Sequence, residues 1–174
     1  FRNLHARRSA MSNRRRAHAL IFAGSIIFAF LLQLTPLPLA LAAFKPYWLA
    51  LVMIYWAIEA PHRVGLGFAF LIGLGGDLLI GQVLGEQALR LVVLVFIVLR
   101  FRSRLRFFPI GQQSLAVLAL LLNDRMVVMM IRGFAGDPMP PLDFWVAPVV
   151  GMLAWPFVFL LLDDLRARIR AKPT

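Results

Sequence analysis

Long apolar runs alternate with short polar segments along most of the chain. Six such runs cover roughly residues 17–35, 46–60, 65–81, 84–100, 110–132 and 143–162. Prolines and glycines stand between them, and proline ends a helix because it lacks a backbone N–H and restricts the residue before it. A bilayer core about 30 Å thick needs about 20 apolar residues per helix. The pattern therefore predicts an all-α fold, a polytopic membrane protein built as a six-transmembrane-helix bundle.

The second and third runs, residues 46–60 and 65–81, are short for a bilayer. Two arrangements fit them: helices with little tilt, or helices that begin inside the protein, because lipid-exposed loops are not tolerated at that depth. The third run is rich in glycine, and Gly65, Ala69 and Gly73 repeat a spacing of small residues that lets helices approach closely in lipid. We therefore expect the third helix to be central to the bundle.

The composition agrees with a membrane protein. Of the 174 residues, 61% are hydrophobic and 16% are charged, whereas soluble domains contain about 25% charged residues. Six spans use nearly the whole length and leave no room for a soluble domain. The absence of cysteine excludes disulfides and thiolate ligands. The three histidines, His5, His18 and His62, are scattered and have no acidic cluster beside them, so we predict no metal site and no cofactor.

The formal charge of +11 would suit a nucleic-acid-binding protein, but such a protein carries its basic residues on a folded aqueous surface. Here the arginines separate apolar runs, as in membrane topology. With six spans and a cytoplasmic start, fifteen of the 19 basic residues fall on one side: Arg2, Arg7, Arg8, Arg14, Arg15, Arg16, Arg63, Arg100, Arg102, Arg104, Arg106, Arg166, Arg168, Arg170 and Lys172. Because basic loops stay in the cytoplasm, we predict that both termini are cytoplasmic.

This topology divides the chain into a basic cytoplasmic N-terminal arm (residues 1–16), a six-helix transmembrane domain (17–162) and a basic cytoplasmic C-terminal tail (163–174). The first apolar run is longer than a signal-peptide core of about 7 to 15 residues, so we expect a retained helix. Whether residues 1–10 are native is left open, because Met11 opens a more ordinary start. The tail sequence DDLRARIR is expected to continue the last helix as a solvated end. Docking of a partner or of anionic headgroups is the alternative.

Four charged residues fall within the apolar runs, where an unpaired charge costs several kcal/mol: Asp77, Arg90, Asp124 and Arg125. At about 1.5 Å per residue, Asp77 and Arg125 lie at similar depths, about 18 Å and 22 Å from the cytoplasmic side. We expect the four to form one neutral polar layer that clamps the helices, and a substrate or ion pathway is the alternative. Arg90 has a second candidate partner in Glu86, four residues before it.

Asp124 and Arg125 have no charged residue three or four positions away, so their partners must come from other helices, water or another protein. Glu59 is expected to meet Arg63 nearby. Pro156 is expected to bend the last span. A further set of aromatic residues is expected to include anchors at the membrane surface: Trp48, Tyr55, Trp56, Trp145 and Trp155.

Motifs spread over nearly the whole chain resemble the MreD family of rod shape-determining proteins from Gram-negative bacteria. The strongest are the run Pro61-His62-Arg63-Val64-Gly65 and a D-L-x-x-G-x-x-L-G-x-x-A-L pattern that begins at Asp77. Further matches are Pro46-Tyr47-Trp48, Tyr55-Trp56, Gly67-Phe68, Gly73, Gln112-Gln113, Asp124 and Trp155-Pro156. Arg125 is a departure from the family pattern. The candidate structural or partner-binding residues are therefore Asp77, Arg90, Asp124, Arg125, His62, Arg63, Gly73, Gly81, Gly85, Trp155 and Pro156.

The resemblance implies a place in the elongation machinery of rod-shaped bacteria, in the inner membrane. It implies MreC as the partner, with links to MreB, to RodA and to the elongation penicillin-binding transpeptidase. It also implies a fold similar to the substrate-binding subunits of energy-coupling-factor vitamin transporters. No nucleic-acid partner is expected, and a homo-oligomer is left open.

The leading hypothesis is a non-enzymatic scaffold that holds the transmembrane segment of MreC and supports peptidoglycan synthesis and rod shape. An enzyme is less favoured, because the five serines are scattered and no nucleophile, base and orienting group cluster in a motif. The alternative is a small-molecule-binding subunit of a vitamin-type membrane transporter, with Asp77 and Arg125 inside the bundle as ligand-binding groups.

Overall fold

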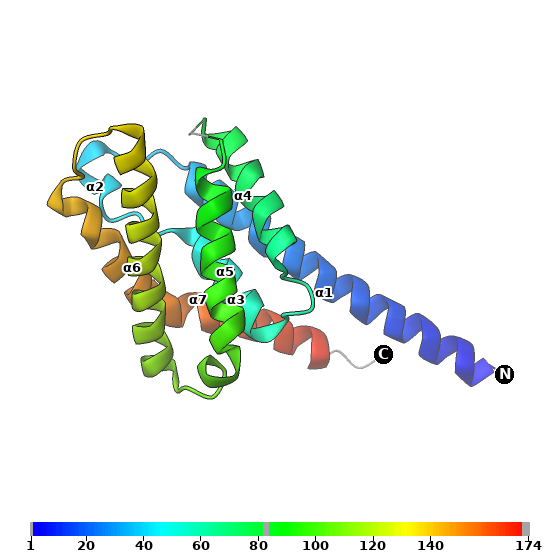
Figure 1. The fold of residues 1–174 in the computed structure, drawn as a ribbon. Helices are drawn as coiled ribbons and strands as arrows, with labels where there is room; N and C mark the ends of the chain where they lie inside the picture. Colours follow the sequence, from blue (N-terminus) through cyan, green and yellow to red (C-terminus); the bar gives the residue numbers. More distant parts are fainter. Residues whose placement is uncertain (1, 82–83, 172–174) are drawn as a thin grey trace.

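The computed structural model describes residues 2–81 and 84–171, and every regular element in this part of the chain is a helix (Figure 1). In chain order these elements are α1 (Arg2–Leu34), α2 (Leu39–Ala42), α3 (Trp48–Glu59), α4 (Leu66–Ile80), α5 (Glu86–Leu105), α6 (Ile110–Ala135), the 3-10 helix η1 (Leu142–Trp145) and α7 (Val146–Ala171). The predicted all-α fold is confirmed. Residue 1 of the expected arm and residues 172–174 of the expected tail lie outside the described residues.

Each of the six apolar runs coincides with one of the longer helices: α1, α3, α4, α5, α6 and α7. Three segments are long and apolar enough to cross a bilayer by themselves, namely Arg15–Leu34, Ile110–Ala135 and Leu142–Ala171. The helices α3 and α4 are apolar but shorter, and α5 carries several charged residues. The chain is therefore a helical membrane protein, and the count of six spans stays a prediction.

The helix α3 lies at the centre of the bundle. Ten of its 12 residues are buried, and it packs against α1, α5, α6 and α7. Its length of about 18 Å is well short of a bilayer core, and Tyr47 and Ala60 at its two ends are buried as well. A helix that is apolar on all sides is suited to such a position. Of the two arrangements predicted for a short run, the structure has the one in which α3 is enclosed by protein.

The expectation that the glycine-rich helix α4 is central was wrong. Its main contact is α5, and only one stripe of the helix, which contains Ala69, Gly73, Gly76 and Asp77, is buried. On the other side its leucines are exposed; Leu71, for example, is 66% exposed. Small residues do allow a close approach, but here they face mainly α5, with Gly76 also close to Phe30 of α1, at the edge of the bundle.

The direction of the helices places both ends of the chain on one side. In Figure 1, α1 begins and α7 ends at the lower right, and α5 passes to α6 at the bottom of the view. By contrast, α4 ends and α5 begins at the top, where α6 also ends. Arginines near the ends of α5 and α7 therefore lie toward the same end of the bundle as the start of α1.

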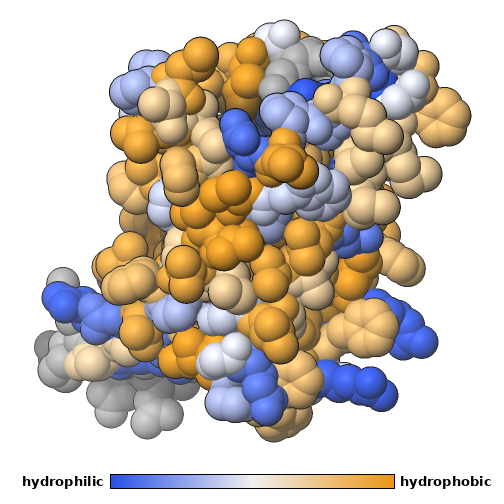
Figure 2. Space-filling view, turned by 90° about the vertical axis from the view of Figure 1, so that its left-hand side faces the viewer, coloured by the Kyte–Doolittle hydropathy of each residue, from blue (hydrophilic) through white to orange (hydrophobic). Residues whose placement is uncertain are grey.

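The outer surface of the bundle is largely apolar. Large side chains such as Met130 and Phe157 are 61% and 77% exposed. Figure 2 shows one such face, in which hydrophobic residues cover most of the middle and hydrophilic ones gather mainly near the top and bottom. An apolar exterior of this kind suits helices whose solvent is the hydrocarbon of a bilayer.

Three of the five aromatic residues among which membrane-surface anchors were expected are part of the core. Tyr55 and Trp155 are 0% exposed and Trp56 is 2% exposed. The indole N–H of Trp56 donates to Ser25 Oγ at 2.8 Å, and the ring of Tyr55 meets that of Phe159 edge to face. The sequence did not separate these three from surface anchors, because an aromatic residue in an apolar run has the same neighbours in sequence whether it faces lipid or protein.

Candidate functional site

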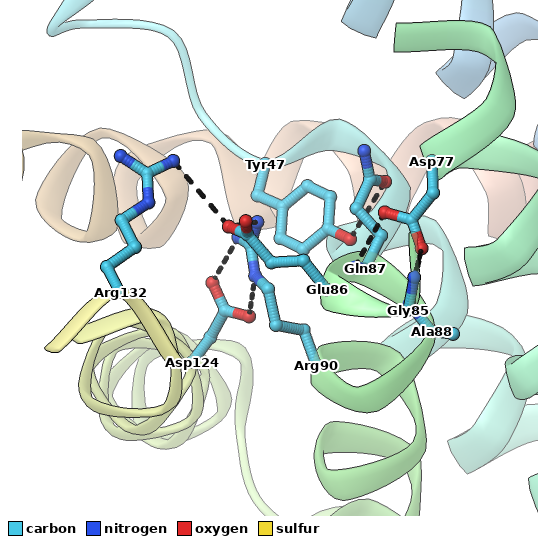
Figure 3. A network of polar contacts seen from close by, with 9 residues as sticks. All are labelled: Tyr47, Asp77, Gly85, Glu86, Gln87, Ala88, Arg90, Asp124 and Arg132. Carbon is cyan, nitrogen blue, oxygen red and sulfur yellow. Dashed lines mark hydrogen bonds and ion pairs between the residues drawn. The ribbon is translucent and has the colours of Figure 1, made fainter. Parts of the chain in front are cut away.

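The most polar part of the bundle interior, here called the polar centre, contains Tyr47, Glu86, Arg90 and Asp124 (Figure 3). Arg90 on α5 donates two hydrogen bonds to Asp124 on α6, from Nε to Oδ1 at 2.8 Å and from Nη2 to Oδ2 at 2.6 Å. The side chains of Arg90 and Asp124 are 11% and 2% exposed. A two-point ion pair of this kind fixes direction as well as charge, so it fastens α5 to α6. Asp124 thus finds its partner on another helix, as its sequence neighbours predict.

Two further groups surround the Arg90 guanidinium. The ring of Tyr47 lies 4.4 Å from it, measured from Cζ to the ring centroid, which is within range of a cation–π interaction. Glu86 Oε1 lies 4.0 Å from Arg90 Nη1 and 3.6 Å from Nη2 of Arg132. The local pair between Glu86 and Arg90 is therefore the longer contact, and Asp124 is the main partner of Arg90.

Asp77 binds backbone groups and not an arginine. Its carboxylate accepts hydrogen bonds from the N–H groups of Gly85 at 2.8 Å, Gln87 at 2.9 Å and Ala88 at 3.4 Å. These groups belong to the start of α5, where backbone N–H groups have no partner within the helix and a negative charge is favourable. Asp77 on α4 therefore caps the next helix of the chain, as Figure 3 shows.

Glycines shape the connection that brings Asp77 to this position. Gly81 ends α4 with φ of 71°, and Gly85 precedes α5 with φ of 97°, a backbone region in which other residues are strained. Closer to the middle of α4, a Cβ atom on Gly73 would lie only 2.4 Å from the Cα atom of Ala88. The pattern from Asp77 to Leu89 thus describes a tight hairpin of two helices, and its residue types are explained by packing and capping.

The four charges expected in one layer do not all bind one another. Arg125 stacks on the ring of Phe144, at 4.3 Å from Cζ to the centroid, and no ion pair of Arg125 occurs among the described residues. Residues 124 and 125 point about 100° apart on a helix, so one faces α5 while the other faces η1. The Asp77 carboxylate lies one turn before the end of α4 and meets the start of α5 instead.

A second buried ion pair was missed at the sequence level. Arg166 on α7 donates to Glu59 Oε2 on α3 at 2.8 Å and to the hydroxyl oxygen of Tyr55 at 3.1 Å. Glu59 was expected to pair with Arg63, but the Arg63 guanidinium lies over the ring of Phe22 at 5.8 Å. Arg166 is 9% exposed, so this part of the DDLRARIR segment is buried and not solvated. The sequence showed only that three arginines follow the last apolar run, and this position did not indicate a partner for Arg166.

The remaining candidate residues lie apart from the polar centre. His62 is exposed in the connection between α3 and α4. Trp155 is buried, and its Nε1 has no hydrogen-bond partner among the described residues. Pro156 lies inside α7, which continues through it as one helix.

The polar centre encloses no ligand-sized space. The gap between Tyr47, Asp124, Arg125 and Pro148 does not admit a water-sized sphere. Larger hollows are open grooves on the outside: one of about 350 Å³ between α5 and α6, and one of about 420 Å³ bordered by α1, α2, α3 and α7. Within residues 2–81 and 84–171, no group of three or more histidine, aspartate or glutamate side chains is placed to hold a metal ion.

Comparisons with known proteins agree on one family. A family model described as rod shape-determining protein MreD matches residues 13–165. The rod shape-determining protein MreD of Haemophilus influenzae is 31% identical to this chain over 144 residues, which cover 83% of this chain and 89% of that protein. No solved structure matches the chain.

Proposed function

The chain belongs to the MreD family of rod shape-determining proteins, and on this premise we propose that it is a non-enzymatic membrane scaffold of the cell-elongation complex. In this role it binds MreC in the inner membrane and supports peptidoglycan synthesis and rod shape. MreB, RodA and the elongation penicillin-binding transpeptidase are the further members of the assembly. The observation that carries the proposal is the family match over residues 13–165.

The use of the buried polar groups supports a scaffold. Asp77 caps α5, Arg90 and Asp124 join α5 to α6, and Arg166 and Glu59 join α7 to α3. Charges buried in this way hold the helices in one arrangement and are not directed at an open cavity. A bundle stiffened from within, with an apolar exterior, is well suited to bind other membrane helices, because packing of matched surfaces drives such association in lipid.

We expect the tagged chain to retain MreC of the same bacterium when the two are expressed together and purified in mild detergent. The measurement is the ratio of MreC to chain after size-exclusion chromatography, with an unrelated single-span membrane protein as the control. The proposal would be contradicted if the chain stayed monodisperse but retained no more MreC than it retains of the unrelated single-span protein.

Six spans with both termini in the cytoplasm are part of the same proposal. The support is the shared side of the two helix ends in Figure 1 and the basic residues near them. Because the chain contains no cysteine, single cysteines at the two ends can be labelled without background. Both ends should be shielded from a membrane-impermeant thiol reagent in intact cells and react after the cells are broken. Labelling of one end in intact cells would refute the topology.

The alternative of a vitamin-type transporter subunit gains no support from the polar centre, because the gap beside Asp124 and Arg125 is closed. A fold similar to the substrate-binding subunits of energy-coupling-factor transporters stays a prediction.

A further inference from the structure

The groove between α5 and α6, here called the α5–α6 groove, has a volume of about 350 Å³ and lies beside the connection of these two helices. Its walls are apolar: Ile97, Phe101, Leu105, Phe108, Ala116, Ala119 and Leu120. On α5 the lining residues run from Ile97 to Leu105, which corresponds to a little over two helical turns or about 12 Å, and Phe108 follows in the connection to α6. On α6 they include Ala116 and Ala119, and small residues let another helix come close. The groove therefore has the shape of a binding site for a helix that lies along α5 and α6.

Two polar side chains interrupt the apolar lining of the groove. Asn123 lies at the end farther from the α5–α6 connection, and its Nδ2 atom is covered by the chain itself and has no hydrogen-bond partner among the described residues. An amide left unpaired in an apolar surrounding carries a cost that a bonding partner removes. At the other end, Arg104 lines the groove and is exposed.

The groove bordered by α1, α2, α3 and α7 differs in this respect. Its lysine, Lys45, is already used, because it donates hydrogen bonds to the carbonyl groups of Gln33 and Thr35. The hydroxyl of Thr35 in the same groove donates to the Leu31 carbonyl oxygen. Lys45 and Thr35 are thus bonded within the chain, whereas the α5–α6 groove contains an amide nitrogen without a partner and an exposed guanidinium.

We propose that the α5–α6 groove holds a transmembrane helix of a partner protein, one that presents a polar side chain to Asn123 and an acidic residue to Arg104. This inference rests on the proposed function, in which the partner is MreC. A lipid acyl chain suits the groove less well, because it is apolar along its length and leaves the Asn123 amide unpaired. A polar side chain on a partner helix bonds that amide once Asn123 turns its Nδ2 atom into the groove, and interhelical bonds of this type contribute to association in membranes.

Replacing Asn123 by leucine tests the groove with two readouts of opposite sign. The substitution removes an unpaired amide, so the isolated chain should keep its thermal stability in detergent or gain some. The affinity for MreC should fall about three- to tenfold, as expected for the loss of one interhelical hydrogen bond. A variant with unchanged affinity for MreC, or one whose isolated chain is less stable, would assign Asn123 to the interior of this chain and overturn the inference.

Disulfide crosslinking can locate the binding site of the partner helix directly, because the chain contains no cysteine that would give background. Single cysteines are placed at Ala119 in the α5–α6 groove, at Ala154 in the other groove and at Leu71 on the exposed side of α4. Each is paired with single cysteines along the transmembrane helix of MreC. We expect Ala119 to crosslink at positions three or four residues apart and the two control positions to give little product.

The outcomes separate this inference from the proposed function. If MreC copurifies but crosslinks mainly to the cysteines placed at Ala154 or Leu71, the α5–α6 groove is not its binding site, although the scaffold function stands. If Ala119 crosslinks two copies of this chain, or if the purified complex holds only lipid in the groove, the inference fails in the same way. If no MreC copurifies at all, the proposed function itself fails.

Discussion

Replacing Asp124 by leucine is expected to destabilise the folded chain by about 3–5 kcal/mol, because it leaves the buried charge of Arg90 without its main partner. Asp124 is 2% exposed and receives both hydrogen bonds of the Arg90 guanidinium toward α6. The measurement is the fraction of chain that stays monodisperse in detergent after heating to a series of temperatures. The midpoint of that curve should fall sharply.

A double variant distinguishes the pair from its single members. When Arg90 is also replaced by methionine, the buried charge is gone and much of the lost stability should return, as found when buried pairs are replaced by apolar residues. The control is the exposed pair of Arg168 and Asp164, which has the same 2.8 Å N–O distance but side chains 76% and 54% exposed. Replacing Asp164 by alanine should cost less than about 1 kcal/mol. Equal effects at Asp124 and Asp164 would show that burial of the pair does not matter.

Replacing Gly73 by alanine is expected to cost about 3 kcal/mol, the upper end of the range for overpacked interiors. The added Cβ would lie 2.4 Å from Ala88 Cα and 2.6 Å from its backbone nitrogen, and a backbone cannot rotate away as a side chain can. The two helices must separate, which also pulls Asp77 from the N–H groups of α5. The same heating series measures the loss of stability.

Gly75 supplies a matched control on the same helix. A Cβ there meets nothing within 4 Å, and alanine is favoured over glycine inside a helix by about 0.5–1 kcal/mol. The alanine variant at Gly75 should therefore be as stable as the natural chain or slightly more so. A Gly73 variant that behaves like the Gly75 variant would disprove the close contact of α4 and α5.

Much of the candidate site could be located from the sequence, but its pairing could not. Asp77, Arg90 and Asp124 stand out because charges are rare in apolar runs, and all three are buried or nearly so in the structure. Their spacing along the chain says nothing about which of them meet, because Arg90 and Asp124 are on different helices. The pair of Glu59 and Arg166 is separated by 107 positions, and a nearer arginine, Arg63, was the natural but wrong partner.

Apolar content, helix breakers and motifs are local properties of the chain, so they were enough to predict the membrane character, the position of each long helix and the family. The central position of α3, the edge position of α4 and the burial of Trp155 depend on how the helices pack, and they became visible in the fold. In water, the polar face of a helix shows which side is outside. In a bilayer both lipid and protein interior are apolar, so an apolar helix carries no such mark until its neighbours are known.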